Sequence, residues 1–66
     1  MKITLNGDDQ EIRDDSSLLE LLETSGFGGK RVAVEINRQI VPRSMHAERR
    51  ICAGDRIEIV HAIGGG

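Results

Sequence analysis

Apolar residues at every second position open the chain, over residues 1–5. A period of two is typical of a strand with one buried face. The following Asn6-Gly7-Asp8-Asp9 segment contains an Asn-Gly pair, which accepts positive φ at little cost and favours a hairpin turn. We therefore expect a second arm over residues 10–13, with Ile12 facing the core.

The period then changes to that of a helix. Ser17 is followed three residues later by Glu20, which is the spacing of a capping box, and Ser25-Gly26 is a helix-ending pair. The apolar stripe between them consists of four leucines, Leu18, Leu19, Leu21 and Leu22. This pattern predicts a short helix over residues 17–24. The adjacent Asp14-Asp15 pair is expected to act as capping charges at the positive end of the helix dipole.

Two further strand regions follow. Residues 32–36 are rich in β-branched side chains, Asn37-Arg38 is a tight turn, and a short return strand over residues 39–41 ends before Pro42. Residues 43–50 are expected to be irregular or to form at most one helical turn.

A last strand closes the pattern. It covers residues 56–61 after a turn at 53–55, and its Ile57 and Ile59 are expected to face the core. The element order ββαβ(β)β predicts an α+β fold of the β-grasp type, a mixed sheet of four or five strands packed on one main helix. We expect a single domain over residues 1–61 and a flexible glycine tail over residues 62–66.

Composition excludes several classes of function. The chain has 66 residues and a net charge of −2, with Phe27 as its one aromatic side chain. A large pocket is not expected in so short a chain. Nucleic-acid binding is disfavoured, since stacking side chains and a basic excess are missing. The charge is uneven, however, because residues 1–23 hold two basic and seven acidic side chains whereas residues 30–50 hold six and two.

The remaining polar residues indicate no catalytic or metal site. His46 and His61 do not fall at a zinc-ligand spacing, and the Gly26–Lys30 segment lacks the full phosphate-loop pattern. We expect no metal and no bound cofactor. The single Cys52 is interpreted as a small core residue and favours a reducing compartment. No apolar run approaches a membrane span, so a cytoplasmic protein with no membrane partner is expected.

Gly64, Gly65 and Gly66 are the candidate functional segment. A carboxylate on Gly66 would stand on a stem without side chains, which could thread a narrow enzyme cleft. Because a carboxylate is a poor electrophile, a partner would have to activate it with ATP as an acyl adenylate. The alternative interpretation is a disordered remnant, but an isoleucine-rich strand runs directly into the tail and no tag sequence accompanies it.

Four segments resemble the ThiS family of sulfur carriers in thiamin biosynthesis, which are ubiquitin-like β-grasp proteins. They are Val32-Ala33-Val34-Glu35-Ile36-Asn37, Ile40-Val41-Pro42-Arg43-Ser44, Ala53-Gly54-Asp55-Arg56-Ile57-Glu58-Ile59-Val60 and Ala62-Ile63-Gly64-Gly65-Gly66. The resemblance covers the whole chain, although its N-terminal half matches mainly in pattern. The family's two last glycines fall on Gly65 and Gly66, and the additional Gly64 is a mild departure.

The resemblance implies a carrier on which enzymes act, and no catalytic activity of its own. A ubiquitin-activating-type adenylating enzyme would use ATP to adenylate Gly66. Sulfur from a cysteine desulfurase or a sulfurtransferase would then give a thiocarboxylate, and thiazole synthase would take the sulfur into the thiazole ring.

The expected docking surface comprises the outward side of the last strand and the tail, namely Val60, Ile63, Gly64, Gly65 and Gly66. An apolar Val60 opposite the Ile57 and Ile59 face has no evident core role. Whether another part of the fold covers Val60 stays open at this point.

Three alternatives also stay open. The small subunit of molybdopterin synthase carries a similar thiocarboxylate, but it resembles this sequence less and usually has prolines ahead of its glycines. A non-catalytic β-grasp interaction module would have an inert tail. A protein modifier would be joined to lysines through Gly66.

Overall fold

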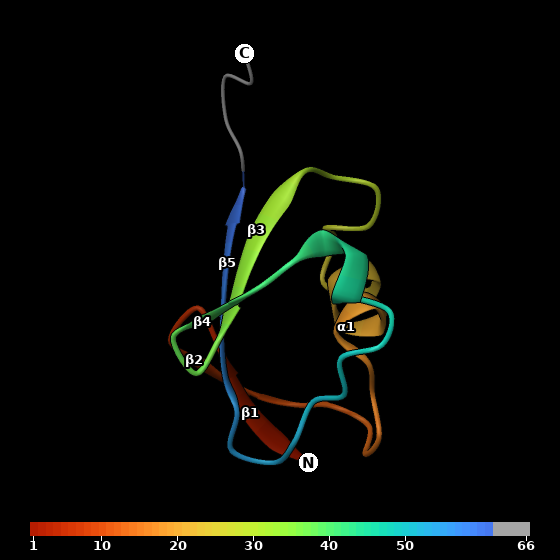
Figure 1. The fold of residues 1–66 in the computed structure, drawn as a ribbon. Helices are drawn as coiled ribbons and strands as arrows, with labels where there is room; N and C mark the ends of the chain where they lie inside the picture. The colour runs from red at the N-terminus through yellow and green to blue at the C-terminus, as the bar shows by residue number, and fades with distance from the viewer. Residues whose placement is uncertain (62–66) are drawn as a thin grey trace.

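A computed structural model describes residues 1–61. Its elements are β1 (Lys2–Leu5), β2 (Asp8–Glu11), α1 (Leu18–Thr24), β3 (Val32–Ile36), β4 (Gln39–Val41), the 3₁₀ turn η1 (Arg43–Met45) and β5 (Arg56–His61). The five strands form one mixed sheet in the order β2-β1-β5-β3-β4, in which β1 and β5 are parallel. Helix α1 lies across one face of this sheet (Figure 1). The predicted α+β, β-grasp arrangement is confirmed, whereas the boundary at residue 61 stays a prediction.

Both hairpins turn through two residues with positive φ. The values are 51° and 88° at Asn6 and Gly7, and 52° and 69° at Asn37 and Arg38, which is the pattern of a type I′ turn. The second hairpin confirms the prediction. In the first, the return strand is β2 (Asp8–Glu11) and not residues 10–13, because a two-residue turn starts the pairing at once, with Leu5 opposite Asp8. Ile12 therefore lies beyond the strand, although it packs partly buried against the core.

The capping box of α1 is confirmed. The Ser17 hydroxyl accepts a hydrogen bond from the Glu20 backbone N–H at 3.1 Å, and the Ser17 backbone N–H donates to Glu20 Oε1 at 2.9 Å. This bond from the Ser17 backbone holds the pKa of the Glu20 carboxyl below its ordinary value. Two donors that the first helical turn leaves unpaired are thus satisfied.

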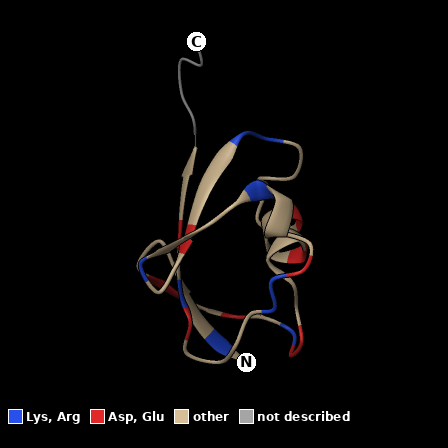
Figure 2. Ribbon diagram, in the orientation of Figure 1, with Lys and Arg blue, Asp and Glu red and all other residues tan. Residues whose placement is uncertain are grey.

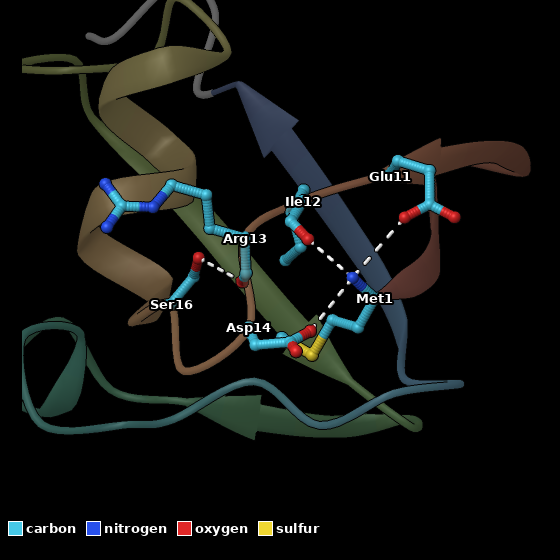
Figure 3. Close-up of polar contacts among 6 residues, drawn as sticks. All are labelled: Met1, Glu11, Ile12, Arg13, Asp14 and Ser16. Carbon is cyan, nitrogen blue, oxygen red and sulfur yellow. Dashed lines mark hydrogen bonds and ion pairs between the residues drawn. The ribbon is translucent and has the colours of Figure 1, made fainter.

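The prediction that Asp14 and Asp15 cap the helix is wrong. Figure 3 shows the Asp14 carboxylate pointing at the Met1 ammonium, 3.1 Å away, where Glu11 also lies at 3.4 Å. The hydrogen bond to Asp14 is the largest cause that raises the pKa of this ammonium. Asp15 has a φ of 67°, and its backbone carbonyl accepts a hydrogen bond from Arg50. The helix start is already capped by Ser17, so this acidic pair instead ties neighbouring segments to the helix entry.

One apolar core lies between α1 and the sheet. Ile57 and Ile59 face it as predicted. Its members are Ile3, Leu5, Leu18, Leu21, Leu22, Val34, Ile36, Val41, Ile51, Ile57 and Ile59. The prediction that Cys52 is a core residue is wrong: its side chain is exposed, because Cys52 begins the turn before β5, in which the Asp55 backbone N–H donates to the Cys52 carbonyl oxygen.

Candidate docking face and the strand that leads to the tail

Strand β5 carries Val60 and leads to the predicted functional tail. The side chain of Val60 is 65% exposed, so the described fold does not cover it. The other predicted site residues, Ile63, Gly64, Gly65 and Gly66, lie outside the described residues. The structure therefore places one member of the predicted docking surface and the strand to which the others are attached.

Val60 belongs to a larger apolar area on the outer face of the sheet. Ala33 of β3 is its cross-strand partner, and Ile40 of β4 is 75% exposed. These residues line a depression of about 160 Å³ together with Glu35, Glu58 and part of Val34. Sequence reasoning missed Ala33 and Ile40, although alternation in residues 39–41 contained the signal, since a buried Val41 requires its neighbour to point outward.

Two carboxylates stand beside this apolar area. Glu35 and Glu58 are directly opposite each other on β3 and β5, and both are half-buried. Like charges in such a pair oppose sheet formation. The outer face thus combines an apolar patch, Ala33, Ile40 and Val60, with two negative charges.

Side chains from both turns fix β5 in place. The Asn6 side-chain oxygen accepts a hydrogen bond from the Ile59 backbone N–H at 2.8 Å. Asn37 donates from its side-chain nitrogen to Asp55 Oδ1 at 3.0 Å and accepts from the Arg56 backbone N–H at the same distance. The strand that presents Val60 is therefore braced at its start and along its length.

Asp55 completes this bracing. Its second carboxylate oxygen accepts the Cys52 backbone N–H at 2.8 Å, and its side chain is buried. The structure thus brings together the Asn37 and Gly54-Asp55-Arg56 segments, which carry much of the family resemblance. Their role here is to position β5.

The described side chains form no evident catalytic constellation. His46 is buried, with its Nε2 placed 3.1 Å from the Val41 carbonyl oxygen, while His61 is exposed. Within residues 1–61, no three His, Cys, Asp or Glu side chains lie close enough to hold a metal ion. None of the helices in this part of the chain has the length and apolar character needed to cross a bilayer.

Two relatives are much longer than this chain. Proteins named thiazole synthase, from Paramagnetospirillum magneticum and Magnetococcus marinus, are 39% and 41% identical over all 66 residues. The chain spans only 20% of the length of each. A stretch similar to the whole of this chain is therefore part of larger proteins of that name.

Other relatives match this chain from end to end. The sulfur carrier protein ThiS of Bacillus subtilis is 37% identical over 97% of this chain and 98% of its own length. The crystal structure of the thiamine biosynthesis protein ThiS from Geobacter metallireducens superimposes with a TM-score of 0.86, at 26% identity over the full length of both chains. The sequence profile of the ThiS family matches residues 3–66. Fold, pattern and relatives agree, and this chain belongs to the ThiS family.

Proposed function

We propose that this protein is a sulfur carrier of thiamin biosynthesis and that Gly66 carries the sulfur as a thiocarboxylate. The single observation that carries the proposal is a family match that continues through the terminal glycines to residue 66. The full-length similarity to a sulfur carrier from Bacillus subtilis supports it. The braced strand β5, which ends at His61 directly before the predicted tail, supports the proposal as a rigid attachment for such a carrier group.

The chemistry requires three steps. An oxygen of the Gly66 carboxylate attacks the α-phosphorus of ATP, and pyrophosphate leaves. The terminal sulfur of a donor persulfide then attacks the acyl carbon and AMP leaves, after which a thiol cleaves the sulfur–sulfur bond and releases the thiocarboxylate. Dividing the reaction in this way replaces one difficult substitution with easier ones.

The partners follow from these steps. A ubiquitin-activating-type enzyme uses ATP to adenylate Gly66, a cysteine desulfurase or a sulfurtransferase supplies the persulfide, and thiazole synthase accepts the sulfur. The similarity of the whole chain to part of two proteins named thiazole synthase supports the last partnership.

We assign Val60, Ile63 and the three glycines to the docking surface, with Ala33 and Ile40 extending it. The chain itself acts as a substrate of these enzymes, in the reducing cytoplasm where ATP and persulfides are available.

Truncation tests the role of Gly66. The full chain and a chain lacking Gly66 are each supplied with ATP, the adenylating enzyme, a persulfide donor and thiazole synthase, and thiazole formation is measured. We expect thiazole with the full chain and at least about a hundredfold less with the truncated chain, because a tail one residue short holds its carboxylate about 3.5 Å from the required position. Thiazole formation at the full rate from the truncated chain would contradict the assignment of Gly66.

A further inference from the structure

A second surface, distinct from the outer face of the sheet, is a cleft between the α1–β3 connection and η1. The cleft has a volume of about 180 Å³, which is room for roughly six water molecules or one large side chain. Its apolar wall is formed by Leu19, Leu22, Phe27 and Val32, and its basic residues are Lys30, Arg31 and Arg43. We call this surface the basic cleft.

The charges of the basic cleft have no partner within the described chain. The ion pairs among residues 1–61 all involve the Met1 ammonium, and none involves Lys30, Arg31 or Arg43. In Figure 2, basic segments stand before β3 and on η1, at the same end of the molecule as the end of β5. Three of the nine basic side chains thus line one cleft, with no ion-pair partner among the described residues.

The basic cleft lies beside the strand that leads to the tail. Val32 of the cleft wall is the cross-strand partner of His61, the last residue of β5. A residue in an extended chain spans at most about 3.6 Å, so the five residues after His61 keep Gly66 within roughly 18 Å of this strand end. The basic cleft is therefore within reach of a partner that receives the tail.

We propose that the basic cleft binds an acidic segment of the enzyme that adenylates Gly66, with an aspartate or glutamate pairing with Arg31 and Arg43 and a neighbouring apolar side chain entering between Phe27 and Val32. This inference rests on the proposed function and specifies the chemistry of the partner. Adenylation needs such guidance most, because its two reactants, the tail carboxylate and ATP, are both anions. Complementary charge also accelerates encounter and fixes the docked orientation.

Charge reversal tests the proposal. Arg31→Glu and Arg43→Glu are compared with Arg38→Glu, a control with the same charge change in the exposed β3–β4 turn away from the cleft. The purified adenylating enzyme is the binding probe, and its dissociation constant is measured at about 0.01 M salt and at about 1 M salt, where screening lengths are about 30 Å and 3 Å. We expect each cleft variant to bind about tenfold more weakly at low salt, with the difference lost at high salt and the control within about twofold of the unchanged protein.

Equal losses in the control and the cleft variants, or no loss in either cleft variant, would overturn the proposal. The same samples are assayed for adenylate and thiocarboxylate by intact mass. If the unchanged protein is converted and the cleft variants bind as well as it does, the proposed function stands and only this inference fails. If the unchanged protein neither binds the enzyme nor is converted, both fail.

The chain's own tail is the other candidate occupant, and backbone amide spectra distinguish it. The spectra of the full chain and of a chain lacking residues 64–66 are compared at Phe27 and Val32. We expect no difference at either amide, because in the proposal the cleft is reserved for the partner and the tail does not enter it. Different amide positions for these residues in the two chains would show that the tail occupies the cleft, and the proposal would be wrong.

Discussion

At the scale of the residue, two asparagines show how one side chain does two tasks. Asn6 and Asn37 occupy the same position in the two type I′ turns, where φ is positive, and asparagine tolerates this region better than most residues. Each also reaches β5 through its side-chain oxygen. The sequence predicted both turns, but it could not predict the second task, since a bond from Asn6 to Ile59 joins residues 53 positions apart.

The second turn contains a strained residue that a substitution should relieve. Arg38 has a φ of 69°, a conformation that costs a non-glycine residue about 1 kcal/mol or more. Arg38→Gly should raise the free energy of unfolding by about 0.5 kcal/mol after the greater entropy of the unfolded glycine is subtracted. Urea unfolding measures the change. Arg38→Ala is the control, since it removes the same charge but retains the strain, and an equal gain in that variant would contradict the explanation.

The capping box predicts a specific dependence on pH. The pKa of Glu20 is lowered from 4.5 because its carboxylate accepts the Ser17 backbone N–H. A group whose pKa is lower in the folded state stabilises the fold above its unfolded pKa, and the stabilisation is lost as pH falls through the folded value. The stability difference between the unchanged protein and Glu20→Gln should therefore be constant near neutral pH and shrink below pH 4.5. Denaturant unfolding across this range measures it, and a difference independent of pH would contradict the ionised capping box.

At the scale of the element, prediction worked where one face of an element is buried. Alternation located β1 and β5, β-branched side chains around the Asn37-Arg38 turn located β3 and β4, and the leucine stripe with its capping box located α1. Strand β2 has the sequence Asp-Asp-Gln-Glu and is exposed throughout, so no hydrophobic pattern could reveal it. The Asn6-Gly7 turn sets its register instead, because a two-residue loop pairs the flanking residues immediately. Its acidic side chains also protect an edge strand against pairing with other chains.

The bond between Asp55 and Asn37 should couple the β3–β4 turn to β5. Asp55→Ala leaves the Cys52 backbone N–H and the Asn37 side chain without their acceptor, and it should lower the free energy of unfolding by about 2 to 3 kcal/mol. Asn37→Gly removes the partner while still permitting positive φ. A double-mutant cycle should give a coupling of about 1 kcal/mol, whereas additivity within about 0.3 kcal/mol would show that the two side chains act independently.

At the scale of the whole molecule, the sequence predicted the β-grasp fold but not the surfaces that form on it. The outer face joins residues of β3, β4 and β5, and the basic cleft joins two connections that are distant in the chain. Such juxtapositions depend on strand order, including the parallel pairing of β1 with β5, which periodicity does not encode. Residues 30–50 hold six basic and two acidic side chains, and the fold places three of the basic ones, Lys30, Arg31 and Arg43, around one cleft.

Val60 should contribute to partner binding and little to stability. Val60→Ser removes an apolar side chain that is 65% exposed, so we expect about tenfold weaker binding to the adenylating enzyme. The free energy of unfolding should fall by less than about 1 kcal/mol. Ala53→Ser, at an exposed residue of the turn before β5, is the control and should leave binding unchanged. Unaltered binding by the Val60 variant would remove Val60 from the docking surface.

The central claim is that Gly66 becomes a thiocarboxylate, and intact mass measurement tests it most directly. The protein is incubated with ATP, the adenylating enzyme and a persulfide donor, and its mass is compared with that of samples lacking ATP or the donor. We predict an adenylate without the donor and, in the complete reaction, a mass in which one sulfur replaces one oxygen at Gly66. An unchanged mass with active enzymes, or a sulfur placed on Cys52 instead, would contradict the account.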